Sequence, residues 1–573
     1  MPTVAHKQYE AMRAFFYEKQ TAAEVADRFG YTVSAVYGLV RNFRRHLKDH
    51  PETDFFFAVK STGRPAQVPP EKSTLDEDII ALRKQNYSTP EITSMLQASG
   101  HKVNYNYVYD LLLREGFARL PRRTRAERQE LSVVRLEAPR AQTWEPCEEY
   151  FDTQHAGLLC FLPILRKYGI DKLIDSSAYP ETREISRLSA ILSFLALKLS
   201  SVRRYSADDL WCMDRGSGLF AGLNVLPKAA WFSSYSHRVT RTMNLDFLRQ
   251  LHRRWCEHDL LGDTANLDFT TIPYWGDEDD HLENNWSGKR SRALVGMLAV
   301  LAHDPHTGII DYGDTDVQHQ TEAQVVLEYL DFYRADDPHG RSLQYLVFDS
   351  RFTNYENLAQ LDERNIKFIT IRRRGKNMIR EIEQLPPSAW NTLRVEAAGN
   401  RKRTLRVADQ TIFLPGYGKD IRQVVITGHG KAKPALIITN DFDLPLEQMV
   451  RKYCRRWLIE KSIAEQIDFF HLNRLSSSMV IKVDFDLVMT ILAHNLYRLL
   501  ALELGRYQHL ADQSVFDRFI YNAGTIAISM NDIRVSLKKK RDLPQLLTAL
   551  NEYTFDIPWL DKKRLVFDGA SNT

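Results

Sequence analysis

Cysteine is scarce in this sequence: the 573-residue chain has 5, and no two of them form a C-x-x-C pair. This argues against a disulfide framework and against a cysteine-ligated zinc site, and it fits a reducing compartment. The chain also lacks an uncharged apolar run of the ~18 residues needed to cross a bilayer, and its N-terminus has no apolar signal segment. We therefore expect a cytoplasmic protein that contacts no membrane.

Glycine and proline are sparse as well, at 26 and 22 residues, which excludes a fibrous or largely disordered chain. A large charge of one sign is also missing, because the formal net charge is only +4. The charge is uneven, however: residues 1–140 hold 22 Lys or Arg and 17 Asp or Glu, and the rest of the chain is close to neutral. A basic N-terminal quarter on a neutral body indicates a module that binds a polyanion.

The first 50 residues carry the pattern of three helices, at 6–19, 22–29 and 35–47. Thr21 is a favourable N-cap for the second helix, and Gly30 is a favourable stop. Three short helices with a Gly-containing turn before the last are typical of a helix-turn-helix domain, whose last helix enters the major groove. The alternative is a three-helix adaptor that does not bind nucleic acid. The residues predicted to contact DNA from the third helix are Ser34, Tyr37, Arg41 and Arg44.

The pattern repeats over residues 74–120. Ser88, followed by Pro90 and by Glu91 three residues after the cap, is a strong helix start. The last helix of this unit, 104–114, begins with Asn104 and Asn106, which we predict to contact DNA. Two such units in tandem would read a longer DNA site than one.

Linkers follow each unit. The first, 51–73, contains a Gly-Arg-Pro segment that is extended because proline disfavours helix at the preceding residue. Arg64 of this segment would fit a narrow A·T-rich minor groove, and the alternative is an ordinary proline-rich linker. The second linker, 121–149, begins inside a cluster of arginines. These arginines either belong to an exposed linker or contact phosphate. The cluster consists of Arg119, Arg122, Arg123, Arg125 and Arg128.

The body of the chain changes from helix to strand. Residues 150–262 look largely helical and show no pattern with a chemical role. From residue 263 the sequence predicts five strands and two helices in the order β-β-β-α-β-α-β, which is the order of a ribonuclease-H-like α/β fold. The predicted strands are 265–272, 293–302, 308–317, 343–348 and 367–371, and the helices are 322–334 and 354–364.

Two acidic residues occupy defined places in this order. Asp268 lies within the first strand, and Asp349 directly follows the apolar fourth strand. In this topology the two strands are neighbours, so both carboxylates can meet at one edge of the sheet. An apolar strand that ends in a carboxylate is costly unless the acid is solvated or bound to a metal. Two adjacent carboxylates repel each other, and a divalent cation relieves that repulsion.

A third acid is expected on the long helix 446–470. Tyr453, Arg456 and Glu460 are spaced i, i+3 and i+7, which places them on one face of that helix. Such a stripe is usually core, but an arginine and a glutamate are poor core residues. Glu465 lies about 140° further round the helix than Glu460 and should not share the site.

These segments resemble a known enzyme family. Leu-Asp268-Phe-Thr-Thr-Ile, Val-Phe-Asp349-Ser-Arg-Phe and Tyr453-x2-Arg456-x3-Glu460 look like the three signature segments of bacterial insertion-sequence transposases of the DDE type, over about residues 265–500. More narrowly, they resemble the branch with a Tyr-x2-Arg-x3-Glu-x6-Lys helix. The chain departs from that pattern at Ile467, where the family usually has Lys. Either Lys461 or Arg474 replaces that DNA contact, or the contact is absent.

The resemblance implies a function and a metal. Asp268, Asp349 and Glu460 would hold two divalent cations, and their oxygen ligands favour Mg²⁺, with Mn²⁺ as a substitute. The enzyme would bind the terminal inverted repeats of an insertion sequence, cleave its ends and join the 3′-hydroxyl to target DNA. Tyr453 and Arg456 would contact that DNA. The partners implied are double-stranded DNA and a second copy of the chain in a homodimer, with no small-molecule substrate, in the bacterial cytoplasm at the nucleoid.

The resemblance also implies a β-rich insertion, 377–433, which divides the catalytic core into 263–376 and 434–482. Its basic residues, among them Arg403 and Arg406, could hold DNA as a flap. We expect residues 483–573 to form a helical tail. Two alternatives to an active transposase remain open at this point: a domesticated, non-catalytic DNA-binding protein and a structure-selective nuclease of the same fold.

Overall fold

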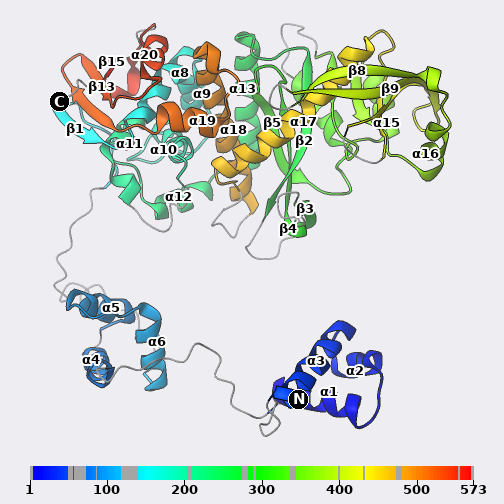
Figure 1. Cartoon of the computed structure of the whole chain (residues 1–573). Helices are drawn as coiled ribbons and strands as arrows, with labels where there is room; N and C mark the ends of the chain where they lie inside the picture. Colours follow the sequence, from blue (N-terminus) through cyan, green and yellow to red (C-terminus); the bar gives the residue numbers. More distant parts are fainter. Residues whose placement is uncertain are drawn as a thin grey trace. The chain divides into compact units, whose positions relative to one another are not determined.

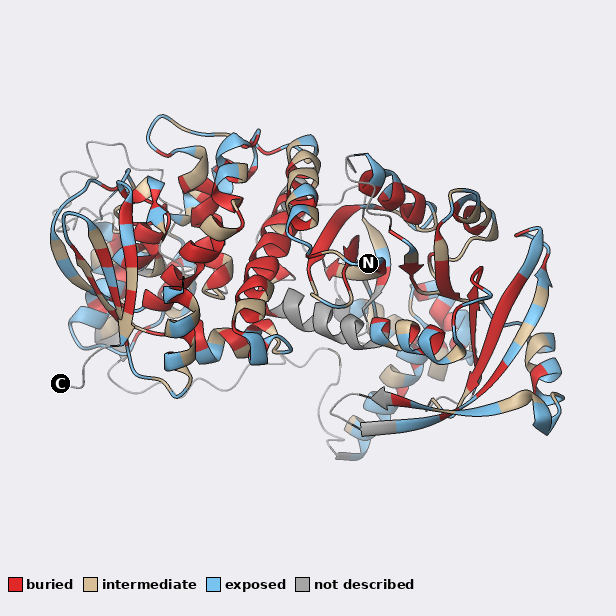
Figure 2. Ribbon diagram, turned by 90° about the horizontal axis from the view of Figure 1, so that it is seen from above, coloured by how far each residue is buried: buried red, intermediate tan, exposed pale blue. Residues whose placement is uncertain are grey.

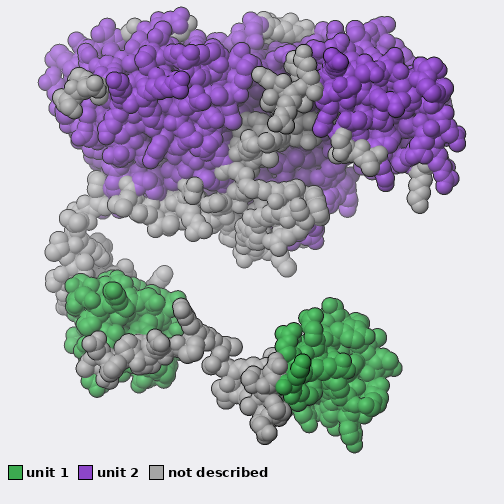
Figure 3. Space-filling view, in the orientation of Figure 1, with its two compact units in different colours: residues 1–136 green, residues 137–573 purple. Residues whose placement is uncertain are grey.

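The computed structural model describes two compact units, residues 1–136 and 137–573 (Figure 3). Arg64, Arg122, Arg123 and Arg125 lie outside the residues that it describes. In α17 (Leu446–Phe469) it gives the backbone of residues 457–468 but not their side chains, and this stretch includes Glu460. The described residues are 4–49, 56, 72–85, 87–117, 120, 140–202, 210–273, 282–287, 292–335, 343–397, 401–429, 433–472, 480–552 and 555–569.

The first part of unit 1 consists of α1 (Val4–Phe16), α2 (Ala22–Phe29) and α3 (Val33–Asp49). The predicted cap is present, because the Thr21 hydroxyl oxygen accepts the backbone N–H of Glu24 at 3.4 Å, and the backbone N–H of Thr21 donates to the Glu24 carboxylate at 2.7 Å. Gly30 ends α2 in the left-handed region, with φ of 62°, where glycine is favoured. A small apolar core holds the three helices together; its fully buried members include Ala11, Val25 and Val36.

The second part repeats this arrangement with α4 (Lys72–Lys84), α5 (Thr89–Ala98) and α6 (Tyr105–Arg114). The Glu91 carboxylate accepts hydrogen bonds from the backbone N–H and the hydroxyl of Ser88, at 2.7 and 2.6 Å. Tyr107 on α6 donates to Asp76 on α4 at 2.5 Å. Burial and this hydrogen bond to a carboxylate raise the pKa of Tyr107 to about 12. The three helices α4, α5 and α6 share an apolar core that includes Ile79, Ile92 and Val108.

Unit 2 is built on a ten-stranded mixed sheet (Figure 1). The strands run in the order β3-β4-β2-β6-β7-β11-β10-β9-β8, and β5 pairs with β4 beside this path. The first half follows the predicted order of strands and helices, with one additional strand, β3 (Glu283–Ser287). Its other elements are β2 (Thr264–Pro273), β4 (Arg292–His303), β5 (Ile310–Val317), α14 (Val325–Arg334), β6 (Tyr345–Val347), α15 (Tyr355–Glu363) and β7 (Lys367–Ile371).

The segment between Asp349 and Glu460 extends this same sheet. After α16 (Lys376–Glu383) come β8 (Trp390–Ala397), β9 (Arg401–Leu414), β10 (Lys419–Thr427) and β11 (Ala435–Thr439). Strand β11 pairs antiparallel with β7, and β10, β9 and β8 follow outward. The predicted β-rich segment is therefore continuous with the core sheet through hydrogen bonds. Helix α17 then packs across β2, β6 and β7 (Figure 1).

Helices from the region before the sheet surround α18 (Val480–Glu503). Residues 483–503 of α18 form the one described segment long and apolar enough to span a membrane, but 83% of its apolar window is buried inside the protein. Figure 2 shows buried residues concentrated in the central helices and in the middle of the large sheet. The helices that contact α18 are α8 (Phe161–Lys167), α10 (Arg187–Leu199), α12 (Ala229–Ser236) and α13 (Arg241–Glu257), while α9 (Ile170–Ser176) and α11 (Arg215–Phe220) pack on α10.

The predicted helical tail is wrong. After α18 and short helical turns, the chain forms β12 (Gly524–Ile528), β13 (Asp532–Leu537), β14 (Asp556–Ile557) and β15 (Lys563–Gly569), with α20 (Leu543–Asn551) packed on β15. They make a five-stranded sheet whose edge strand, β1 (Glu149–Thr153), comes from the region predicted to be helical. Residues 524–528 form a strand and not a helix because their burial alternates with a period of two, so that one face of β12 packs on the core.

Candidate active site

The two predicted acids follow the paired residues of β2 and β6. The strands are parallel, with Ala265 opposite Leu346 and Asn266 opposite Val347, where the pairing ends. Asp268 lies two residues after Asn266, and Asp349 lies two residues after Val347, just beyond the end of β6. Next to this pair, the rings of Phe269 and Phe352 stack with their centroids 3.9 Å apart. The segments that carry Asp268 and Asp349 therefore meet through the Phe269–Phe352 contact.

Asp268 is half-buried beneath α17. Its Oδ1 accepts a hydrogen bond from the backbone N–H of Phe269 at 2.9 Å. Nη1 of Arg456 lies 3.5 Å from the same oxygen, and the Arg456 side chain is only 3% exposed. One turn earlier on α17, Lys452 donates to the Thr264 hydroxyl at 2.7 Å. These two contacts fix the line along which α17 crosses β2.

Asp349 begins the loop after β6. Its Oδ1 accepts from the backbone N–H of Arg351 at 2.8 Å, and its carbonyl oxygen accepts from the hydroxyls of Thr353 and Thr370 at 3.3 and 3.2 Å. The Arg351 guanidinium pairs with Glu322 and lies 5.1 Å from the Phe269 ring centroid. This ion pair was not predicted from the sequence, because Glu322 lies 29 residues before Arg351.

The prediction that Tyr453 contacts DNA is wrong for this structure, because Tyr453 is fully buried. It belongs to an apolar cluster with Val347, Ile369 and Ile437. The i, i+3 spacing did place Tyr453 beside Arg456, whose guanidinium carbon is 5.4 Å from the ring centroid. The phenol face packs on the sheet, so this side chain supports α17 from below.

A basic cavity of about 580 Å³ opens beside Asp349. Arg372, Arg373 and Arg374, which follow β7, line it together with Arg403 of β9 and Arg456 of α17. Among the residues described, the four arginines other than Arg456 form no ion pair with a carboxylate. Neutral oxygens orient them instead: the amide of Gln423 and the carbonyls of Ser350, Pro434 and His429.

Uncompensated guanidinium groups held by neutral acceptors keep most of their donors available for an anion. Asp349 is the one acid that lines the described part of this cavity. The sequence indicated basic residues in both segments but gave no sign that β7 and β9 place them around one carboxylate.

Two of the three carboxylates predicted to bind divalent cations, Asp268 and Asp349, belong to the described side chains. Asp268 on β2 and Asp349 just after the neighbouring strand β6 have the carboxylate oxygens that Mg²⁺ prefers. Within the described ranges, no group of three or more His, Cys, Asp or Glu side chains forms a metal site. The third predicted ligand, Glu460, lies four residues after Arg456 on α17, which is close to the same angular position on the helix. Its side chain is outside the description, so its role stays a prediction.

The predicted DNA-contacting residues of unit 1 lie on exposed faces. Ser34, Tyr37, Arg41 and Arg44 are exposed on α3, and Tyr37 is 58% exposed. In the second part, Asn104 and Asn106 are also exposed. Asn104 has a structural task too, since its side-chain oxygen accepts the backbone N–H of Tyr107 at 2.8 Å and caps α6.

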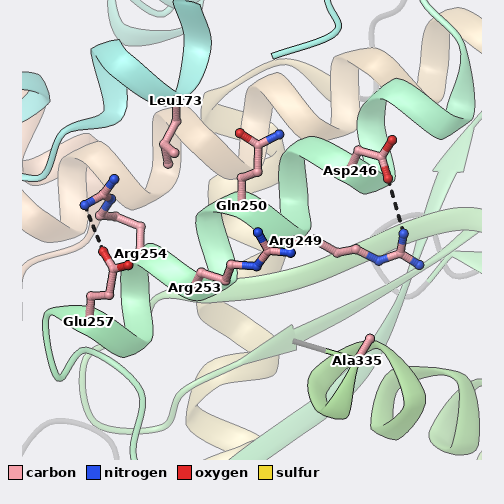
Figure 4. Close-up of a pocket in the computed structure, with 8 residues that line it drawn as sticks. All are labelled: Leu173, Asp246, Arg249, Gln250, Arg253, Arg254, Glu257 and Ala335. Carbon is pink, nitrogen blue, oxygen red and sulfur yellow. Dashed lines mark hydrogen bonds and ion pairs between the residues drawn. The ribbon is translucent and has the colours of Figure 1, made fainter. Parts of the chain in front are cut away.

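A larger cavity, of about 710 Å³, lies on α13 and has a different character (Figure 4). Arg249 and Arg254 in its wall pair with Asp246 and Glu257 at 3.2 and 2.8 Å, so two of its guanidinium groups are neutralised. It contains neither Asp268 nor Asp349.

Part of the chain is similar to a known protein family. Residues 262–496 match the sequence model of the transposase DDE domain, so the resemblance to DDE transposases noted in the signature segments is confirmed. The matched residues span the strands that carry Asp268 and Asp349 and helix α17. No curated protein sequence matches the chain.

Among solved structures, the chain is similar to the piggyBac transposase in a synaptic complex with hairpin DNA. The two share 12% identity, with a TM-score of 0.35, over 70% of this chain and 84% of that one. A TM-score this low does not establish a common fold.

Proposed function

We propose that this protein is a transposase with a ribonuclease-H-like catalytic core, which cuts the ends of a bacterial insertion sequence and joins them to target DNA. The proposal is supported by the match to the transposase DDE domain, within which Asp268 and Asp349 follow the paired residues of the parallel strands β2 and β6 and Asp268 lies beneath Arg456. In this proposal Glu460 on α17 completes the set of three carboxylates.

The residues around the site would divide the work. Asp268, Asp349 and Glu460 would hold two Mg²⁺ ions, or Mn²⁺ in their place, which supply an activated water and stabilisation of the leaving oxygen. The arginines beside Asp349 would bind the phosphates that flank the cut and orient the scissile bond. Phe269 and Phe352 would keep the two strand ends aligned. The new 3′-hydroxyl would then be positioned by the same arginines for attack on target DNA.

Unit 1 would supply sequence recognition. We propose that its two three-helix parts are helix-turn-helix domains that bind the terminal inverted repeats. Tyr37 and Arg41 lie one turn apart on the exposed face of α3, where both could reach one stretch of major groove. We further propose that two copies of the chain assemble on a pair of ends, in the bacterial cytoplasm.

The test of catalysis uses the purified full chain and linear DNA that carries the inverted repeats flanking its gene, with Mg²⁺. Asp268→Asn, Asp349→Asn and Glu460→Gln should each abolish end cleavage and leave DNA binding intact. Glu465→Gln is the matched control on another side of α17 and should cleave normally. A carboxylate variant that cleaves at the wild-type rate contradicts its assignment, and a wild-type protein that only binds would indicate a non-catalytic DNA-binding protein.

The test of recognition compares binding to repeat DNA and to unrelated DNA. Tyr37→Ala and Arg41→Gln should lower affinity for the repeat more than for unrelated duplex, by about 1–3 kcal/mol for a lost base contact. Arg28→Gln on α2 is the control, because Arg28 pairs with Glu18 at 2.8 Å. Equal losses on both DNAs would assign these residues to the backbone instead.

A further inference from the structure

The last helices of the two three-helix parts, α3 and α6, begin in the same way. Thr32 precedes α3, and its hydroxyl oxygen accepts the backbone N–H of Ala35 at 3.2 Å. Asn104 precedes α6, and its side-chain oxygen accepts the backbone N–H of Tyr107 at 2.8 Å. Residues at equal distances from these two caps therefore hold equivalent positions on the two helices.

The equivalent positions match in burial. The fourth residue after each cap is fully buried in the core of its own part, and these residues are Val36 and Val108. The first residue after each cap is an exposed apolar or aromatic side chain: Val33 is 44% exposed and Tyr105 is 48% exposed. The two helices thus turn the same face to the core and the same face to solvent.

The solvent face of each helix begins with a pair of large side chains. A tyrosine follows the first residue by one turn in both helices: Tyr37, which is 58% exposed, and Tyr109. In α6 the rings of Tyr105 and Tyr109 stack with their centroids 6.2 Å apart. In α3, Val33 and Tyr37 have the same spacing, which makes them neighbours on the helix surface. Apolar side chains that gather at equivalent exposed places in two domains indicate a binding surface.

The charge along α3 makes DNA the partner that fits this surface. Beyond its second turn, α3 exposes Arg41, Arg44 and Arg45. Arginines bind the DNA backbone and fix the position of a helix, whereas base pairs are distinguished by the side chains that reach their edges. In a helix-turn-helix domain these are the N-terminal residues of the last helix. The exposed apolar pairs of α3 and α6 stand at that place.

The residue types at the start of both helices indicate which bases they contact. Arg and Lys are the side chains that read guanine, and Asp and Glu accept from cytosine. None of these four occurs in residues 33–37, Val-Ser-Ala-Val-Tyr, or in residues 105–109, Tyr-Asn-Tyr-Val-Tyr. Apolar side chains pack on the methyl group of thymine, and Asn forms two hydrogen bonds with adenine. Asn106, the second residue of α6, is exposed.

We propose that the starts of α3 and α6 read A·T base pairs in the terminal repeat. In α3, Val33 and Tyr37 pack on the methyl groups of thymines. In α6, Asn106 holds an adenine by its N6 and N7 atoms, and Tyr105 packs beside it. This inference rests on the proposed function, because it takes the two three-helix parts as domains that bind the repeat, and it adds the class of base pair that they recognise.

The first experiment removes the thymine methyl groups and keeps the base pairing. It compares binding of the full chain to a duplex that carries the inverted repeat and to the same duplex with uracil in place of every thymine. One lost apolar contact with a methyl group lowers affinity about fourfold, so the uracil duplex should bind more weakly by at least that factor. The penalty should be smaller in Val33→Ala and in Tyr37→Ala. Leu47→Ala, on the last turn of α3 at 48% exposure, is the matched control and should keep the full penalty.

The second experiment removes the adenine N7 acceptor from the major groove. The same repeat duplex is made with 7-deazaadenine in place of adenine, which leaves the base pairing intact. The wild type should bind it about fivefold more weakly or worse, because a bidentate contact loses one of its two hydrogen bonds. Asn106→Ala should show little or no further loss on this duplex. Leu113→Ala, on the last turn of α6 at 63% exposure, should show the wild-type loss.

Both experiments can overturn the inference with the wild type alone, so the result does not depend on a variant that folds. A wild type that prefers the repeat but binds both modified duplexes as tightly as the unmodified one overturns the inference and leaves the proposed function intact. A penalty on one modified duplex alone overturns the assignment of the other helix. A wild type that binds the repeat no better than unrelated duplex contradicts the proposed function itself.

The variants separate base contacts from two other origins of the same effects. A uracil penalty that is equal in the wild type, Val33→Ala and Tyr37→Ala overturns the role of α3, because the methyl groups then act through the shape of the DNA. Unchanged DNA affinity in these variants, together with altered self-association in analytical ultracentrifugation, overturns it as well and assigns the apolar pair to a contact between proteins. Thermal unfolding of each variant confirms that it is folded.

Discussion

Phe269 and Phe352 stack face to face, with ring centroids 3.9 Å apart and planes 5° from parallel. Phe269 follows Asp268 on β2, and Phe352 is three residues after Asp349, so this contact joins the chain segments that carry the two acids. Arg351 and its partner Glu322 cover the same aromatic pair. The alignment of the two carboxylates therefore depends on packing as well as on strand pairing.

Replacement of Phe269 by Leu should slow cleavage without loss of DNA binding. The stacked pair contributes about 0.5–1.5 kcal/mol beyond its buried area, and a catalytic group displaced by 1 Å loses on the order of 10²-fold in rate. We expect cleavage to fall by about 10–100-fold in single-turnover assays. Phe413→Leu on β9 is the control, because Phe413 is 61% exposed. An unchanged rate would mean that strand pairing alone positions the acids.

The arginines beside Asp349 should contribute to DNA affinity in a sequence-independent way. Arg373→Gln and Arg403→Gln should each weaken binding to any duplex and reduce the slope of log affinity against log salt by about 1, since each removes one phosphate contact. Arg534→Gln should change neither quantity, because Arg534 pairs with Asp568 at 3.1 Å on the smaller sheet. A loss confined to the repeat sequence would argue against phosphate contacts.

Local signals made unit 1 predictable from the sequence. Thr21 with Glu24, and Ser88 with Glu91, set helix starts through contacts three residues apart, which a single sequence displays. The strands of the core were also predictable, because β2 is rich in β-branched and aromatic residues and β4 is a long, mostly apolar run. In contrast, β1 and β12 are paired although more than 370 residues separate them in the sequence, and a local sequence pattern does not predict so distant a partner.

Some features of the candidate site could likewise be predicted from the sequence, and others could not. The pairing of β2 with β6, the strands on which the prediction for Asp268 and Asp349 depends, was predictable because the order of elements indicates which strands are neighbours. The burial of Tyr453 was not, since helical spacing places it beside Arg456 but does not say which of the two faces the sheet. The basic cavity depends on the meeting of β7 with β9 through β10 and β11, which is a property of the sheet and not of any segment.

Two buried histidines should respond oppositely to the same substitution. His494 is held by Asp512 at 2.7 Å and by the carbonyl of Gly308 at 2.9 Å. Neither ring nitrogen of His303 makes a hydrogen bond of standard geometry within the described chain. His494→Leu should lower the free energy of unfolding by about 3–5 kcal/mol, because it strands a buried carboxylate.

His303→Leu should leave the free energy of unfolding unchanged or raise it by about 1 kcal/mol, since it removes a desolvated polar ring of similar size. Urea denaturation of the full chain, followed by the fluorescence of unit 2, measures both. A loss of several kcal/mol in His303→Leu would reveal a water or another partner that holds this imidazole.

A buried ion pair joins α13 to β5. His252 Nδ1 lies 2.9 Å from Asp311, and both side chains are 2% exposed. Burial alone would lower the pKa of His252, but the charge and hydrogen bond of Asp311 outweigh it and raise the pKa to about 10. Since the pKa of histidine in the unfolded chain is about 6.5, the folded state binds the proton more tightly.

The stability of unit 2 should therefore fall between about pH 6.5 and pH 10. Below the lower value His252 is protonated in both states and its contribution is complete; above the higher value the folded state has lost the proton and the contribution with it. Other groups also titrate in this range, so the comparison is with His252→Gln/Asp311→Asn, which keeps hydrogen-bonding amides without charge. The wild type should lose more thermal stability from pH 7 to pH 10 than this variant. Parallel curves for the two proteins would show that His252 is neutral in the folded state.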